Sequence, residues 1–160
     1  MSELIPEWHR LAASAALAIR RHGRDHFPEN MRGACCIASV LLAIAYEARG
    51  IQCAVAQTKS RKHNYEHAWV EVDGQPVDIT ATQFGFHEFV RLTPISRKPA
   101  RRDSRRVSQI LHTSSLGWRL HPWAPHRRFD LLVPALADVL QIGPAEALCR
   151  VRAFVGPGAP

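Results

Sequence analysis

A cysteine at the start of a predicted helix is the best candidate for a nucleophile in this chain. Residues 35–49, CCIASVLLAIAYEAR, are good helix formers, and Gly50 follows at the position where such a helix is expected to end. The free N–H groups and the dipole at a helix N-terminus stabilise negative charge. Because the helix is expected to begin within a residue of Cys35, this thiol has a setting that favours the reactive thiolate.

A thiolate also needs an imidazole as base or ion-pair partner, and a third group that fixes the tautomer of the imidazole. Residues 66–80 read EHAWVEV, DG and QPVDIT, which is typical of two strands joined by a tight turn. The Asp-Gly pair at 73–74 favours a two-residue type I′ turn. The sequence therefore predicts a hairpin at this place.

The hairpin brings the other two groups together. With the turn at 73–74, cross-strand partners have numbers that sum to 147, so that His67 faces Thr80 and Trp69 faces Asp78. Since side chains alternate between the faces of a sheet, these four project from one side. Asp78 is then expected to accept the ring N–H of His67, which leaves the other ring nitrogen facing a helix packed on the sheet.

The remaining pattern supplies elements that would support this centre. Amphipathic spacing predicts a first helix, an apolar run predicts a buried strand, and a polar stretch predicts a connection before the hairpin. Later in the chain the pattern indicates a further strand and short helices entered near two prolines. The first helix is expected over residues 6–22, ending at Gly23, the buried strand over 51–57 and the polar connection over 58–65. The further strand is expected over 86–95 and the short helices over 130–153, entered near Pro134 and Pro144.

The ordered strings GACCIASVLLAIAYEARGIQCAV and HAWVEVDGQPVDIT resemble the transglutaminase-like branch of the papain-like cysteine enzymes. The similarity covers residues 30–85, roughly a third of the chain. It implies Cys35 as nucleophile, His67 as base and ion-pair partner, and Asp78 as the group that orients His67. Cys36 is the alternative nucleophile, although Cys35 fits the spacing of the family better.

The resemblance also suggests residues that would support the reaction. Acyl transfer needs donors to an oxyanion, and the backbone N–H of the cysteine is one. Asn30, five residues upstream, is the candidate for a side-chain donor, because the family often has one there. Trp69 is expected to wall the site or to pack, and Thr80 and Gln83 to hydrogen-bond Asp78 or to shape the pocket.

The reaction implied is attack of a thiolate on an amide through a thioester intermediate, without a cofactor. A backbone amide makes such an enzyme a peptidase, and a glutamine side chain makes it a deamidase or, with an amine acceptor, a transglutaminase. The leader peptidases that mature lasso peptides are similar in having H-A-W-V-E before a short turn. We rank a hydrolase of peptides or proteins first, with cleavage slightly ahead of deamidation.

A competing motif overlaps the same histidine. Residues 63–67 spell H-x-x-E-H, in which two histidines of one helix would bind zinc. The alternating pattern that follows favours an extended chain, so we expect no metal site. The four cysteines have no paired spacing that would indicate a disulfide framework or a zinc ribbon: Cys35, Cys36, Cys53 and Cys149.

Charge is distributed unevenly along the chain. The net charge is +7, and residues 91–128 hold ten Lys or Arg against one acid, Asp103. This basic segment, with RKPARRDSRR at 97–106, is interpreted as a docking surface for an acidic peptide or protein substrate. A non-catalytic module that binds nucleic acid is the alternative, with Trp118 and Trp123 further along.

The composition, 46% apolar and 22% charged over 160 residues, is that of a single globular domain. No apolar run approaches the length of a membrane span, and the acidic start of the chain is unlike a secretion signal, so we expect a cytoplasmic protein. We expect an α+β domain over residues 1–160, in which a central helix packs on a small antiparallel sheet. Within it, 30–85 form the catalytic core and 129–160 a helical cover.

Overall fold

A computed structural model describes residues 5–60, 65–95, 101–103 and 125–155. The described residues form an α+β fold, as the sequence predicts. Its helices and strands follow one another in the order α1 (Glu7–Gly23), α2 (Cys35–Ala48), β1 (Ala54–Ser60), β2 (Tyr65–Val72), β3 (Gln75–Val77), the 3-10 turn η1 (Ala81–Phe84), β4 (Arg101–Asp103), α5 (Pro125–Leu140) and α6 (Pro144–Val155).

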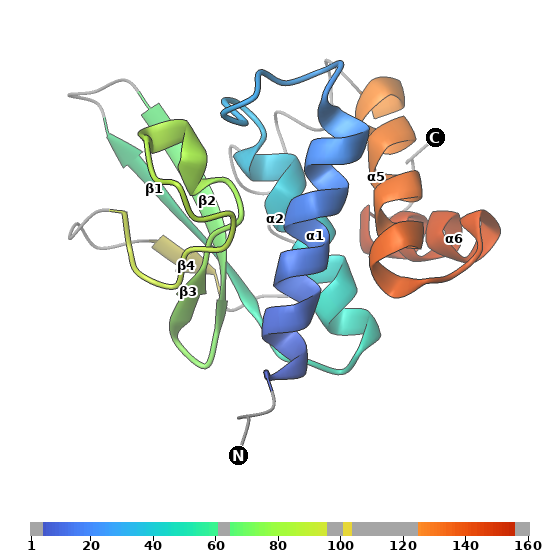
Figure 1. The fold of residues 1–160 in the computed structure, drawn as a ribbon. Coiled ribbons are helices and arrows are strands. Elements are labelled where there is room, and N and C mark those ends of the chain that lie inside the picture. The colour runs from blue at the N-terminus through green and yellow to red at the C-terminus, as the bar shows by residue number, and fades with distance from the viewer. Residues whose placement is uncertain (1–4, 61–64, 96–100, 104–124, 156–160) are drawn as a thin grey trace.

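The elements are arranged in layers around the second helix. The strands form one antiparallel sheet in the order β3-β2-β1-β4. Helices α1 and α2 lie beside this sheet, and α5 with α6 lies on their far side (Figure 1). Helix α2 thus lies in the middle, between the sheet and the C-terminal helices.

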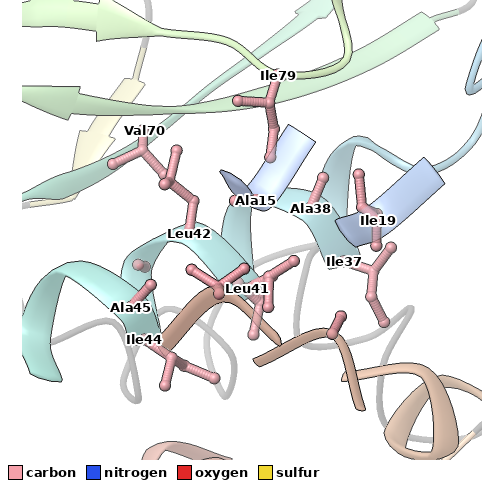
Figure 2. Close-up of a cluster of buried hydrophobic side chains, with 14 of the residues drawn as sticks. Ala15, Ile19, Ile37, Ala38, Leu41, Leu42, Ile44, Ala45, Val70 and Ile79 are labelled. Atoms are coloured by element: carbon pink, nitrogen blue, oxygen red, sulfur yellow. The ribbon is translucent and has the colours of Figure 1, made fainter. Parts of the chain in front are cut away.

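Helix α2 is apolar all round because it is covered on all sides. Its residues from Cys35 to Tyr46 are all buried. Figure 2 shows Leu42 reaching toward Val70 of the sheet, while Ile37 and Ile44 point toward the opposite layer. A helix with this pattern belongs in a core. Burial of each such large side chain stabilises the fold by about 1.5–3 kcal/mol, which fixes α2 against β2.

Gly50 ends α2 as expected and explains why the next strand begins late. Its φ is +69°, and its N–H donates to the Glu47 carbonyl while the Ile51 N–H donates to the Tyr46 carbonyl. This is the Schellman arrangement, which needs a left-handed residue after the helix. Because this cap uses the chain through Ile51, strand β1 spans Ala54–Ser60 rather than 51–57, and it takes in part of the predicted polar connection.

The predicted hairpin is present with the predicted register. Asp73 and Gly74 have φ of +51° and +76°, as a type I′ turn requires. The pairs Val70–Val77, Glu71–Pro76 and Val72–Gln75 all have numbers that sum to 147. In this register the pair that contains Pro76 is a non-hydrogen-bonded one, so the missing N–H of the proline lies on the outer edge of β3 and removes no ladder bond.

The ladder is shorter than predicted. It ends at Val77, and Thr80, with φ −130° and ψ 16°, has left the strand conformation and does not pair with His67. Asp78 instead exchanges backbone hydrogen bonds of 2.9 and 2.8 Å with Arg91, on the side away from β2. That single bridge is the only strand-like pairing described in residues 86–95, where a longer strand was expected.

The C-terminal prolines differ in their positions. Pro144 begins α6, as predicted, whereas Pro134 lies inside α5 and does not begin a helix. A proline inside a helix lacks one backbone donor, and the packing of α5 against α1 and α2 supports the helix across it. Of residues 91–128 the structure describes only 91–95, 101–103 and 125–128; Trp118 and Trp123 lie outside the described residues.

Part of the arginine-rich run is an edge strand. Residues 101–103 pair with β1 as β4. Within the described residues no individual helix has the length and hydropathy of a membrane span, although Leu131–Leu140 and Pro144–Phe154 pass that test together as a pair bent by 114°.

Candidate active site

Cys35 is the first residue of α2, where the chain turns sharply into the helix. Met31 and Gly33 both have positive φ, and the Ala34 N–H donates to the Met31 carbonyl. Ala34, before the helix, has no side chain that could cap the first N–H groups. The first turn of α2 therefore presents backbone donors beside the Cys35 thiol, which favours an anion there.

His67 and Asp78 form a buried pair on the sheet. Nε2 of His67 donates to Oδ2 of Asp78 across 2.6 Å, and both side chains are almost inaccessible. The other carboxylate oxygen, Oδ1, accepts from the backbone N–H of Thr80 at 2.9 Å and from its hydroxyl at 3.3 Å. The carboxylate is thereby held in one orientation, and it fixes the ring of His67 with Nε2 protonated.

Neighbouring side chains hold the ring on its other sides. Phe84 contacts it edge-on, with centroids 4.7 Å apart, and Trp69 stacks beside it at 5.7 Å. The Gln83 side-chain Nε2 lies 3.2 Å from Nδ1 and donates to the Thr80 carbonyl at 3.1 Å. Because Asp78 occupies Nε2, Nδ1 is the ring nitrogen that remains for the thiol; Nδ1 can accept from Gln83 when the ring is neutral and carries the second proton in the imidazolium.

Cys35 and His67 are hydrogen-bonded and influence each other's ionisation. A hydrogen bond from the Cys36 thiol lowers the pKa of Cys35, burial opposes this, and the hydrogen bond and charge of His67 lower it further, to about 5. Burial would lower the pKa of His67, but hydrogen bonds and charge from Asp78 and Cys35 raise it to about 9. Between these values the thiolate–imidazolium pair is the favoured form.

The other two thiols lack this setting. Burial and the nearby Glu47 raise the pKa of Cys53 to about 12. Cys149 is exposed on α6. Cys36 is buried next to Cys35, and its thiol supports the neighbouring sulfur. Cys35 makes the hydrogen bond with His67 described above, and Cys35 is also the cysteine that the sequence favours as nucleophile.

The expected supporting residues are partly brought together. Thr80 binds Asp78 as expected, Trp69 packs on His67, and Gln83 contacts His67 rather than Asp78. Asn30 is exposed, and its side-chain oxygen accepts from the Arg32 N–H within a turn. None of its described hydrogen bonds reaches the cysteine or the histidine, so its expected role as an oxyanion donor has no geometric support.

Three residues near the site were not expected. Phe84 follows Gln83 in η1 and forms one wall for His67. Arg20 donates to the Ile79 carbonyl at 3.1 Å, and Arg91 pairs with Asp78. The arginines are separated from their partners by long stretches of chain, so local patterns could not reveal them. The aromatic residue after Gln83 was visible in the sequence, but nothing there indicated its direction.

The overlapping zinc motif does not have the required helix. Residues 65–72 form strand β2, so Glu66 and His67 lie on an extended chain, while His63 lies outside the described residues. Among the residues that are described, no three His, Cys, Asp or Glu side chains gather in a way that could hold a metal ion.

Comparison of the chain with protein-family models, with curated proteins and with solved structures gives no match.

Proposed function

We propose that this chain is a cysteine-dependent amide hydrolase or acyltransferase that acts on a peptide or protein. The observation that carries the proposal is the connected chain of groups from Cys35 through His67 to Asp78. It joins a thiol with a low pKa, an imidazole with a raised pKa and a fixed carboxylate. Buried groups whose pKa values are moved apart in this way are typical of acid–base and nucleophilic catalysis.

The proposed reaction uses each of these groups once. The Cys35 thiolate attacks the amide carbon, and backbone N–H groups at the start of α2 stabilise the oxyanion that forms. Nδ1–H of His67 then gives its proton to the leaving amine, and a thioester remains on Cys35. Water, deprotonated by His67, hydrolyses the thioester to a carboxylic acid and restores the thiol. Throughout, Asp78 keeps the second ring N–H and stabilises the imidazolium.

The papain-like architecture, in its transglutaminase-like form, belongs to the same proposal. It is supported by the order of the motifs and by the packing of α2, with Cys35 at its start, against the antiparallel strand that carries His67. The mechanism requires a reduced thiol, so we expect the protein to work in a reducing compartment such as the cytoplasm.

The test is mass analysis of a peptide library, containing internal glutamines, after incubation with the protein. Shorter fragments mean cleavage, the outcome that we favour, and a gain of about one dalton at intact length means deamidation of a glutamine side chain. Cys35→Ala should abolish either product. Cys36→Ala is the matched control and should retain product formation. An unchanged product in Cys35→Ala would refute the proposed nucleophile.

A further inference from the structure

A cleft of about 770 Å³ lies next to the candidate site. This volume is in the range of binding sites for small ligands or for a few residues of a peptide. Its walls come from the C-terminal half of α1, the loop that leads to α2, and the chain around and after η1. The lining residues are Arg20, Arg24, Phe27, Pro28, Glu29, Asn30, Met31, Thr82, Phe86, His87 and Phe89.

The walls of the cleft are continuous with the residues that hold the catalytic pair. Thr82 lines the cleft, and the next residue, Gln83, contacts His67. The Thr82 hydroxyl donates to the Asn30 carbonyl at 3.0 Å, which ties η1 to the loop before Cys35. The cleft therefore shares its walls with the loop that leads to Cys35 and with the turn that contacts His67.

Arg20 joins the cleft to the catalytic pair. Its guanidinium donates to the Ala16 and Ile79 carbonyls at 2.8 and 3.1 Å and to the Thr82 hydroxyl at 3.3 Å. These bonds use three of its five N–H groups. They hold the guanidinium in place through uncharged oxygens, while the carboxylate of Asp78 interacts with its charge without a described hydrogen bond.

The cleft combines positive charge with aromatic surface. Arg24 is the residue after α1, one turn beyond Arg20. Its side chain is 81% exposed and lies 4.0 Å from the carboxylate of Asp25, an ion pair that is weak at such exposure. The Arg20 guanidinium lies 4.0 Å from the centre of the Phe89 ring, and Phe89 is itself 48% exposed. Two arginines outnumber the single carboxylate of the lining, Glu29. An anionic group beside an apolar side chain is the ligand that such a surface complements.

We propose that this cleft is the subsite for the part of the peptide substrate next to the reacting amide, and that it selects an acidic residue adjacent to an aromatic one. The assignment rests on the proposed function, because the elements that the cleft shares with Cys35 and His67 are what favour a peptide. The Glu29 carboxylate would repel the several charges of a nucleoside triphosphate more than the single charge of a carboxylate. The lining residues named above all precede the basic segment 91–128 in the sequence, and Arg91 of that segment packs on the ring of Phe86, which lines the cleft.

Binding to an inactive protein tests the subsite separately from the reaction. The probe is a fluorescent peptide with a Glu-Phe pair, measured by anisotropy with the Cys35→Ser variant, against a Gln-Phe peptide of the same length. We expect the Glu-Phe peptide to bind more tightly and to lose affinity as salt rises, whereas the Gln-Phe peptide should be nearly insensitive to salt. Equal affinities for the two peptides would overturn the assignment.

A charge reversal in the cleft gives the matched comparison. Arg24→Glu should weaken Glu-Phe binding about tenfold, which corresponds to about 1.4 kcal/mol. Arg10→Glu makes the same charge change at an exposed position of α1, fourteen residues and thus about 21 Å away along the helix, and should change affinity less than twofold. Equal losses in both variants would show non-specific attraction and refute a subsite, as would displacement of the peptide by micromolar ATP.

The two proposals can fail independently. Selective Glu-Phe binding by the Cys35→Ser variant, with no turnover of any peptide by the unmodified protein, supports the subsite and refutes the hydrolase. Turnover that depends on Cys35 but is equal for Glu-Phe and Gln-Phe peptides supports the hydrolase and refutes the subsite.

Discussion

Removal of the imidazole should return the Cys35 thiol toward ordinary behaviour. The change is His67→Ala, made in a Cys149→Ser background so that the exposed thiol does not react. Hydrogen bonds from Cys36 and with His67, together with the charge of His67, bring the pKa of Cys35 to about 5 against the effect of burial. A thiol is a weak, neutral donor, whereas the imidazolium carries a full charge, so we expect loss of the ring to dominate. The pKa should then rise toward the ordinary value of about 8.5.

The size of the effect follows from the fraction of thiolate. At pH 6 a pKa of about 5 leaves roughly nine-tenths of the thiol ionised, and a pKa of about 8.5 leaves roughly 0.3%, about a 300-fold difference. A more basic thiolate is intrinsically more nucleophilic, and with a Brønsted slope near 0.45 this recovers about 40-fold. The net rate at pH 6 should fall only about eightfold, so the midpoint of the pH profile is the stronger measurement.

The assay is the rate of reaction with a dipyridyl disulfide between pH 4 and pH 9.5, with the modified residue identified by peptide mapping. The unmodified protein should show a midpoint near pH 5, since the pKa of Cys35 is about 5. His67→Ala should move it up by about three pH units. Cys36→Ala is the matched control and should move it less, while circular dichroism shows that each variant is folded. A midpoint above pH 8 in the unmodified protein, or one unchanged by His67→Ala, would refute the reasoning.

Three further outcomes are expected. Asp78→Asn removes a charge and a hydrogen bond that help to raise the pKa of His67 to about 9, so the imidazolium should lose its proton at lower pH. The alkaline limb of the pH–activity profile should therefore shift to lower pH, and an unshifted limb would contradict this. Leu42→Ala, at a fully buried position, should lower the free energy of unfolding by about 2–5 kcal/mol in urea titrations, against less than about 0.5 kcal/mol for Leu17→Ala at an exposed one. Gly74→Ala places a side chain at φ +76° and should destabilise the protein by about 1 kcal/mol in the same titration. The cost comes from the backbone conformation, because an added Cβ would meet no atom within 4 Å.

Local chemistry accounts for what could be predicted from the sequence. The Asp-Gly turn fixed the hairpin register, and the run after Cys35 ending at Gly50 fixed α2, because each depends on residues close in the chain. The contact between His67 and Asp78 followed from side-chain alternation even though the ladder ends before Asp78. Contacts across long separations were missed: the bridge from Asp78 to Arg91 has no local signature.

Contacts with distant parts of the chain also explain why the predictions for Pro134 and Asn30 were wrong. Pro134 was expected to begin a helix because a proline favours the first turn, but the packing of α5 against α1 and α2 supports a helix that continues through it. Asn30 was placed at the site by its position five residues before Cys35 and by the resemblance to the family, whereas the loop uses its side chain to make a turn with Arg32. Loop conformation depends on contacts with distant elements, and spacing does not record them.

The proline of β3 has a consequence for the behaviour of the protein at high concentration. Since β3 lies at the margin of the sheet, its outer side is where a strand of another molecule could add. Pro76 faces that side with no N–H to offer, and the strand is only three residues long. The hairpin that carries His67 and Asp78 is thereby a poor template for intermolecular pairing. The sheet on which the proposed chemistry depends thus resists recruitment into aggregates along this margin.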